Sequence, residues 1–373
     1  MSFSDFDRHM MTLALLMARR GWGATAPNPS VGAVLADEAT GEVIARGVTQ
    51  PGGRPHAEVE ALARAGDRAR GATLYVTLEP CAHHGKTPPC AEAAVAAGVG
   101  RVVIGVEDPD ARVAGQGISL IRDAGVRVEV GLMAEAARWA TLGHILRVTE
   151  RRPFVQLKMA LAADGMVPRG AGGRALFVTG PEARAQGHLL RAEADAILIG
   201  GGTARDDDPE LTCRLPGLGS RSPIRVVLSR RLDLSPGLKL VRTAREVPVW
   251  AVTGDDADPE RVRALEGAGV RVVQGSALGD RLDMRDVLAI LADGGVTRLL
   301  VEGGAGVWQA FAAERLVDEV VLFQAGVAGA EVRDTTALAG EYAPGLDLAR
   351  VATQRLGADL MTVLRTARAA RST

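Results

Sequence analysis

Apolar positions in the first half of the chain follow two different periods. Met10, Leu13 and Met17 recur at the spacing of one helix face, which predicts an amphipathic helix near the start. Short apolar runs then predict strands, and the stretches between them have helical spacing. We expect strands over residues 31–37, 42–48, 72–80, 101–109 and 126–131, and helices from residue 56, from residue 90, over 116–123 and over 134–146. This alternation predicts a layered α/β domain.

The alternation resumes after a charged run at residues 150–153, Glu-Arg-Arg-Pro. Proline ends a helix and charge favours solvent, so the run indicates a domain boundary, with a solvated helix end as the alternative. Domains usually hold about 100–200 residues, so we divide the 373 residues into two domains, 1–149 and 150–373. In the second domain we expect strands over residues 154–165, 195–200, 224–229, 247–254, 270–275, 297–304, 319–323 and 360–366.

Composition narrows the classes of function. The chain carries 44 basic and 45 acidic side chains and only 3% aromatic residues. A nucleic-acid or anionic-membrane surface needs a basic excess, so we expect neither partner. Acidic residues precede the first apolar stretch, unlike in a signal peptide, and no apolar run reaches the roughly 18–20 residues that span a bilayer. Three cysteines, two of them in one metal-ligand pattern, favour a reducing compartment, and we expect the cytoplasm.

The strongest chemical signal combines His56, Glu58, Cys81 and Cys90. Catalytic zinc takes three protein ligands and keeps a fourth position for water, and one imidazole with two thiolates suits Zn²⁺. Because zinc makes hydroxide available near neutral pH, a carboxylate outside the ligand set must move protons, and Glu58 is the candidate. The His-x-Glu and Pro-Cys elements form the signature of zinc nucleobase deaminases. A structural zinc site is the alternative, but it normally has four protein ligands.

Three further residues are candidates for substrate contact beside this pattern. Eight residues separate Cys81 from Cys90, where the usual signature has two. The longer loop can bring His83 and Lys86 over a phosphate or a pyrimidine carbonyl, although each alone could equally be an exposed loop residue. Asn28 lies between two prolines on a non-helical loop, where its amide can hydrogen-bond a planar base or simply form a turn.

Glycine turns follow two predicted strands of the second half. Residues 302–306, Glu-Gly-Gly-Ala-Gly, and residues 200–203, Gly-Gly-Gly-Thr, could let backbone N–H groups approach a phosphate, or could be tight turns. We expect residues 206–209, Asp-Asp-Asp-Pro, to form a loop and not a metal site, because consecutive aspartates point in different directions. Arg230 and Arg231 follow a strand and could equally meet the 2′-phosphate of NADPH or form a solvated turn.

Taken together, the motifs resemble the bifunctional riboflavin-biosynthesis deaminase–reductase family over essentially the whole chain. The matching first-half elements are residues 27–29 (Pro-Asn-Pro), 31–32 (Val-Gly), 56–58 (His-Ala-Glu), 77–81 (Thr-Leu-Glu-Pro-Cys), 85–90 (Gly-Lys-Thr-Pro-Pro-Cys), 108–109 (Asp-Pro) and 113–117 (Val-Ala-Gly-Gln-Gly). The resemblance implies a cytidine-deaminase-like αβα domain followed by a dihydrofolate-reductase-like α/β domain.

The resemblance also implies two successive reactions. The first half would remove the 2-amino group of 2,5-diamino-6-(5-phosphoribosylamino)pyrimidin-4(3H)-one as ammonia. His56, Cys81 and Cys90 would hold one zinc ion, with Glu58 moving the proton. The second half would use NADPH to reduce the ribosyl side chain to ribityl. The partner would be this small phosphorylated pyrimidine ribonucleotide, and we expect a homo-oligomer.

For the second half, the resemblance implies two sets of site residues. Arg191 and Arg214 would hold the substrate phosphate, and Lys158 and Glu302 would lie near the pyrimidine. The full substrate set is Lys158, Ala175, Arg191, Leu211, Arg214 and Glu302. The NADPH set is Ala160, Phe177, Thr203, Asp207, Ser229, Gly304, Ala305 and Gly306.

The second half also departs from the family pattern. Residues 162–163 are Ala-Ala where the family has Ser-Leu, and Met166 replaces a basic residue. Residues 175–177 read Ala-Leu-Phe in place of Ser-x-Trp, and residues 324–327, Gln-Ala-Gly-Val, replace a Pro-Lys element. One alternative is therefore a deaminase of the same pathway with a weakened or non-catalytic second domain. A zinc deaminase of cytidine or RNA is another, and the charge and few aromatics disfavour it.

Overall fold

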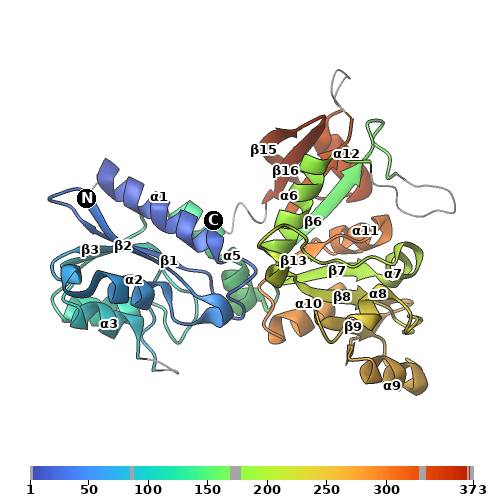
Figure 1. Cartoon of the computed structure of the whole chain (residues 1–373), viewed down its shortest axis with the longest axis horizontal. Helices are drawn as coiled ribbons and strands as arrows, with labels where there is room; N and C mark the ends of the chain where they lie inside the picture. Colours follow the sequence, from blue (N-terminus) through green and yellow to red (C-terminus); the bar gives the residue numbers. More distant parts are fainter. Residues whose placement is uncertain (1–2, 85–87, 169–177, 327–332, 368, 370–373) are drawn as a thin grey trace. The chain divides into compact units, whose positions relative to one another are not determined.

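In the computed structural model, the chain forms two compact units, one ending at Arg152 and the other beginning at Pro153 (Figure 1). The structure describes residues 3–84, 88–168, 178–326, 333–367 and 369. The last helix of the first unit, α5 (Ala134–Glu150), ends where Arg151 takes a left-handed conformation with φ 54°. Across the described residues, no helix is both long and apolar enough to cross a membrane.

The first unit is built on a five-stranded sheet in the order β2-β1-β3-β4-β5. Strands β3, β4 and β5 run parallel, while β1 is antiparallel to both β2 and β3. The strands expected from the sequence are confirmed, with ends shifted by a few residues: β1 (Gly32–Asp37), β2 (Glu42–Val48), β3 (Thr73–Leu78), β4 (Arg101–Val106) and β5 (Arg127–Val130). The expected helices form as well: α1 (Asp5–Arg20), α2 (Ala57–Ala65), α3 (Cys90–Ala96), α4 (Gln116–Asp123) and α5.

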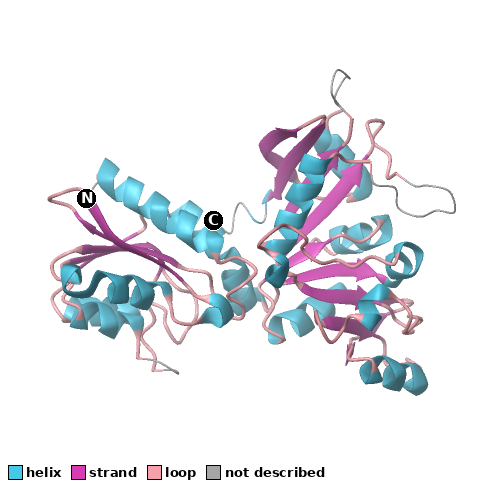
Figure 2. Cartoon of the chain, in the orientation of Figure 1, coloured by secondary structure: helices cyan, strands magenta, loops and turns pink. Residues whose placement is uncertain are grey.

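Helices cover both faces of this sheet (Figure 2). Helices α1 and α5 pack on one face, and α2, α3 and α4 lie on the other. Residues of β1 alternate between the two cores: Val34 packs with the α1 side and Leu35 with the α2 side. A strand buried on both faces is continuously apolar, which explains the unbroken run Gly-Ala-Val-Leu-Ala in β1.

The second unit contains a nine-stranded sheet in its described part, in the order β10-β9-β8-β7-β13-β6-β14-β16-β15. From β10 to β14 in this order, neighbouring strands are parallel. Strand β16 is antiparallel to β14, and β15 is antiparallel to β16. The strands are β6 (Phe154–Leu161), β7 (Ala196–Gly200), β8 (Ile224–Leu228), β9 (Val249–Thr253), β10 (Arg271–Gln274), β13 (Arg298–Val301), β14 (Glu319–Gln324), β15 (Leu348–Leu356) and β16 (Asp359–Thr366), with a small hairpin of β11 (Ala277–Leu278) and β12 (Arg281–Leu282). The helices are α6 (Pro181–Ala192), α7 (Gly201–Asp207), α8 (Lys239–Arg242), α9 (Pro259–Gly267), α10 (Met284–Asp293), α11 (Ala305–Ala313) and α12 (Thr335–Tyr342).

The second unit differs from the sequence expectations at β15, at the hairpin of β11 and β12, which was not expected, and at residues 206–209. Strand β15 was not expected: among the described residues it pairs with β16 alone, at the sheet edge, and because it exposes most of its side chains it has no apolar period. The loop expected over residues 206–209 is wrong for Asp206 and Asp207, which form the end of α7. The helix stops only at Asp208, which has a left-handed φ of 41°.

The parallel strands of the second unit bring the candidate residues to one edge of the sheet. Strands β6, β7, β8 and β13 are parallel, so their carboxyl ends lie at the same side. The glycine turns that open α7 and α11 both follow these ends directly. In α/β sheets, ligands bind outside the carboxyl ends of the strands, and this edge is therefore where a site is expected.

Candidate functional site

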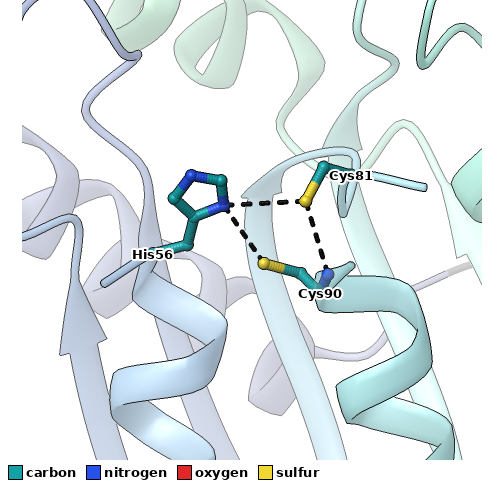
Figure 3. A group of neighbouring side chains, drawn as sticks. All are labelled: His56, Cys81 and Cys90. Atoms are coloured by element: carbon teal, nitrogen blue, oxygen red, sulfur yellow. Dashed lines mark hydrogen bonds between the residues drawn. The ribbon is translucent and has the colours of Figure 1, made fainter. Parts of the chain in front are cut away.

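Three side chains from three separate elements meet in the first unit. His56 caps the N-terminus of α2, Cys81 follows β3 closely, and Cys90 is the first residue of α3. The Nδ1 atom of His56 lies 3.2 Å from Sγ of Cys90 and 3.6 Å from Sγ of Cys81. The three side chains point toward one another (Figure 3), and their donor atoms all lie within 4.8 Å of each other. One imidazole and two thiols at this spacing fit a catalytic zinc ion with a fourth position for water.

The surroundings of Cys81 favour its metal-binding form. The thiol of Cys90 and the ring of His56 lower the pKa of Cys81 to about 4, against the opposing effect of burial. The backbone N–H of Cys90 also donates to Sγ of Cys81, at 3.3 Å. Because the thiolate is the form that binds metals, Cys81 is already in its metal-binding form at neutral pH, whereas the neighbouring Cys81 and burial raise the pKa of the Cys90 thiol.

Glu58 lies in the first turn of α2, two residues after His56, and is 4% exposed. Burial raises the pKa of Glu58 to about 7, although the nearby His56 opposes the shift. A buried carboxyl with a pKa near neutrality can both accept and release a proton, as general acid–base catalysis requires.

Two glycines allow the helices that carry the site to approach the strands closely. A Cβ atom on Gly47, in β2, would lie 2.0 Å from the carbonyl oxygen of Ala57 in the first turn of α2. A Cβ atom on Gly117, in α4, would lie 1.9 Å from the carbonyl oxygen of Pro80, next to Cys81. Only glycine fits either position without moving a backbone that leads directly to a ligand.

The three residues predicted to contact the substrate in this unit differ in what the structure shows of them. The Nδ2 atom of Asn28 lies 3.5 Å from Nε2 of His56 and donates to the carbonyl of Gly53 at 2.8 Å, so Asn28 lies beside one of the predicted metal ligands. His83 is partly buried, and its Nδ1 atom has no hydrogen-bond partner in the part of the chain that the structure describes. Lys86 lies outside the described residues.

Glu79 was not identified from the sequence, although it directly precedes the Pro80-Cys81 pair. Its buried carboxylate accepts four backbone N–H groups: those of Gly115 and Gly117 at 3.0 Å, Ile118 at 3.2 Å and Asp108 at 3.3 Å. It thereby holds the start of α4 against the end of β3. Its position directly before the Pro-Cys pair was the one sequence feature that could have drawn attention to Glu79. The N–H groups that it binds lie too far along the chain for a local motif to reveal them.

In the second unit, Lys158, Arg191 and Glu302 form an ionic cluster. Arg191 donates from Nε and Nη2 to the two carboxylate oxygens of Glu302, and Nζ of Lys158 lies 3.7 Å from Oε2. Burial alone would raise the pKa of Glu302, but the charges of Lys158 and Arg191 lower it to about 2. The cluster therefore keeps a carboxylate ionised at the carboxyl end of β13.

The predicted residues Leu211 and Arg214 lie in the loop that follows α7. Leu211 is buried and has a left-handed φ of 57°, which is uncommon for a residue with a side chain and is frequent at functional sites. Nη1 of Arg191 donates to the carbonyl of Thr212 at 3.1 Å, linking the loop to the ionic cluster. The side chain of Arg214 contacts Glu210 and the hydroxyl of Thr212.

Most of the predicted NADPH residues lie along the carboxyl edge of the sheet. A Cβ atom on Gly304, the N-cap of α11, would lie 3.6 Å from the hydroxyl of Thr203 in α7, and one on Gly201 would lie 3.3 Å from the hydroxyl of Ser229. Ala160 shares the less buried face of β6 with Lys158. Ala305 and Gly306 form the first turn of α11, and Asp207 ends α7; Ala175 and Phe177 lie outside the described residues.

The two arginines at the end of β8 differ in their surroundings. Arg230 forms ion pairs with Asp256 at 2.9 Å and with Asp280 at 3.0 Å, whereas the side chain of Arg231 is exposed. The guanidinium of Arg230 is engaged by these two carboxylates, so a phosphate would have to compete with them. This environment favours the solvated-turn interpretation for Arg230.

Comparison with known families matches both units. Residues 4–106 match the cytidine and deoxycytidylate deaminase zinc-binding region, and residues 153–361 match the RibD C-terminal domain. The chain is 36% identical to the riboflavin biosynthesis protein RibD of Aquifex aeolicus, over 86% of this chain and 86% of that protein.

Solved structures agree with the sequence comparison. Acinetobacter baumannii RibD, form 2, superposes with a TM-score of 0.80 at 31% identity, covering 97% of this chain and 99% of that one. The Thermotoga maritima diaminohydroxyphosphoribosylaminopyrimidine deaminase/5-amino-6-(5-phosphoribosylamino)uracil reductase gives a TM-score of 0.78 at 31% identity, with the same coverage. On this agreement over most of its length, the chain belongs to the RibD family of riboflavin biosynthesis proteins.

Proposed function

We propose that this protein deaminates 2,5-diamino-6-(5-phosphoribosylamino)pyrimidin-4(3H)-one and then reduces the ribosyl side chain of the product with NADPH. The observation that carries the first step is the buried carboxyl of Glu58 beside the His56, Cys81 and Cys90 donors. The second step is supported by the ionic cluster at the carboxyl edge of the second sheet. Family membership supports the pairing of the two activities in one chain.

In the first unit, the residues divide into metal holders, a proton carrier and an orienting group. A zinc ion held by His56, Cys81 and Cys90 would supply a water molecule that ionises near neutral pH. Glu58 takes a proton at its carboxylate and delivers it to the departing amine, which its pKa of about 7 allows. Asn28, next to His56, orients the planar pyrimidine through its side-chain amide.

In the second unit, the residues bind and orient the reactants. NADPH would supply the hydride that reaches C1′ of the opened ribosyl chain. The row of Thr203, Ser229 and Gly304 lines the edge where a dinucleotide would lie. Lys158 and Glu302 present one cation and one anion to the pyrimidine, and Arg191 holds Glu302 in place.

We assign the deaminase to residues 1–149 and the reductase to residues 150–373, and we propose that the protein acts in the cytoplasm as a homo-oligomer. The ligand set of zinc lies before residue 149, and the ionic cluster lies after residue 150, which supports this division. Light scattering of the purified chain tests the oligomeric state. A monomer at all concentrations would contradict that part of the proposal.

A two-step assay on zinc-loaded protein tests the function. Ammonia release from the diaminopyrimidine ribonucleotide is followed first, and NADPH oxidation is followed after NADPH is added. Ammonia followed by NADPH consumption supports both activities. Ammonia alone would favour the alternative, a deaminase whose departures at Ala162 and Met166 accompany a weakened reductase, and no ammonia would contradict the substrate. Cytidine, assayed in parallel, tests the other zinc-deaminase alternative.

A further inference from the structure

His188 lies on α6, one helical turn before Arg191, and so shares its face of the helix. The backbone N–H of Arg214 donates to Nδ1 of His188 at 3.4 Å. The side chain is partly buried, and neither the zinc site nor the ionic cluster of Lys158, Arg191 and Glu302 uses it. His188 therefore connects the helix that carries one predicted phosphate ligand with the loop that carries the other.

The surroundings of His188 keep its ring neutral. Burial lowers the pKa of His188, and the charges of Arg191 and Arg214 lower it further, while the backbone of Thr212 and the charge of Glu302 act in the opposite direction without cancelling the shift. A neutral imidazole keeps one ring nitrogen as a hydrogen-bond acceptor, which is what the N–H of Arg214 requires. The ring thus stays available as a partner for this loop at neutral pH.

Side chains from elsewhere hold the backbone of three successive loop residues. The carbonyl of Thr212 accepts from Arg191 at 3.1 Å, the N–H of Cys213 donates to Oγ of Ser222 at 3.1 Å, and the N–H of Arg214 donates to His188. Leu211, which precedes these residues in the loop, has a left-handed backbone that needs support from its surroundings. These contacts give the loop a defined shape without regular secondary structure.

The guanidinium of Arg214 depends on this backbone for its direction. Its side chain is 52% exposed, and its polar contacts are with Glu210 and Thr212 of the same loop. Such contacts move with the loop, so they cannot fix Arg214 relative to α6. The contact to His188 reaches across to the helix of Arg191.

We propose that His188 is a positioning residue for phosphate recognition: by anchoring the backbone of Arg214 to α6, it directs Arg214 toward the substrate phosphate. This inference rests on the proposed reductase function, because that function supplies the phosphoribosyl substrate. His188 acts through Arg214 and does not take part in hydride transfer. Its loss should therefore weaken binding of the phosphate and leave the chemical step intact.

Calorimetry with ribose 5-phosphate tests the proposal directly on the full chain. We expect His188→Ala to raise the Kd for ribose 5-phosphate about five- to tenfold, as the loss of one anchoring hydrogen bond predicts, with no such effect on ribose. His188→Asn places an amide oxygen near the position of Nδ1 and should restore most of the affinity. Gln186→Ala, on the same helix, is the matched control and should bind like the wild type.

Two results would overturn the proposal. One is a His188→Ala protein that binds ribose 5-phosphate as tightly as the wild type, and the other is a wild type that binds it no better than ribose. If His188→Ala does not fold, His188→Gln, which moves the polar atoms one bond outward, is compared with His188→Asn. Equal affinity of those two variants would also count against the anchoring role.

Kinetics separate this inference from the proposed function itself. In NADPH oxidation with the phosphoribosyl substrate, His188→Ala should raise KM and leave kcat nearly unchanged, because a positioning residue acts on binding. A wild type that binds ribose 5-phosphate but oxidises no NADPH would contradict the reductase function and leave the positioning role standing. A wild type that oxidises NADPH, with no change of either Kd or KM in His188→Ala, would contradict the positioning role alone.

Discussion

The guanidinium of Arg191 grips the carboxylate of Glu302 through two hydrogen bonds, Nε to Oε1 and Nη2 to Oε2, each 2.8 Å long. Two parallel hydrogen bonds of this kind fix the orientation of the carboxylate and also balance its charge. A lysine would balance the charge without fixing the orientation. Glu302 follows β13 directly, so its partner on α6 determines how the acid faces the edge where the reactants are expected. Through this pair, the packing of α6 against the sheet sets the orientation of an acid that we propose contacts the substrate.

Removing Arg191 should destabilise the protein more than removing both partners. Arg191→Ala leaves the buried carboxylate of Glu302 without its two-fold hydrogen-bonding partner, with Lys158 3.7 Å away, at a cost of about 3 kcal/mol in the free energy of unfolding. Adding Glu302→Gln should recover part of this loss, because the unpaired charge is then gone. Urea denaturation of the two single variants and the double variant measures the coupling, and strictly additive values would contradict the pairing.

Glu58→Gln should abolish deamination while leaving the metal site intact. The amide cannot carry the proton, and the loss of a general acid–base group typically lowers the rate by about 10²–10⁴-fold. Zinc content, measured by atomic absorption, should match the wild type because Glu58 is not among the three donors. Glu60→Gln on the same helix, where Glu60 pairs with Arg64, is the control and should deaminate normally. Full ammonia release by Glu58→Gln would refute the assignment.

Gly47→Ala should weaken zinc binding, although Gly47 is not itself a predicted ligand. The added methyl group would lie 2.0 Å from the carbonyl of Ala57, so α2 must move away from β2 and carry His56 with it. Overpacking of this kind costs about 1–3 kcal/mol. The expected result is a lower midpoint of unfolding together with reduced zinc content. Gly267→Ala, whose methyl group meets nothing within 4 Å, should leave the zinc content unchanged.

Chelation of zinc should separate the two activities. The three donors all lie in the first unit, so a chelator should stop ammonia release, while reduction of already deaminated substrate by NADPH continues. Thiol titration gives a second readout, because Cys81 and Cys90 should become reactive only after the metal is removed. Parallel loss of both activities under chelation would contradict the division of labour between the units.

The first unit should lose stability in acid because Asp7 becomes protonated. Burial acts to raise the pKa of Asp7, but hydrogen bonds from Arg101, Ser4 and Tyr75 lower it from 3.8 to about 2. A depressed pKa adds stability above pH 3.8 that is lost as the pH falls through about 2. Asp7→Asn should therefore be less stable at neutral pH and lose less stability over that interval. Thermal unfolding at several pH values measures both, and an unchanged acid dependence would contradict the prediction.

Residue order alone indicated much of the fold and the metal chemistry. Regular elements follow local periodicity, so the strands and helices of the first unit could be placed before the structure, and the family comparison confirms the α/β fold class of both halves. The predicted zinc ligands were recognisable because a metal demands particular donor atoms, and His56, Cys81 and Cys90, which the structure brings together, offer them in a compact pattern. The family comparison likewise confirms the expected zinc-binding region.

Tertiary structure decided the contacts between residues that are distant in the chain. Glu79 finds its four N–H donors 29 to 39 positions later, and Arg191 reaches Glu302 across a separation of 111 residues. Strand β15 exists because β16 offers it an edge, since its own side chains are mostly exposed. The local sequence pattern around a residue does not reveal such partners, because hydrogen bonding and ion pairing depend on distance in space and not on spacing in the sequence.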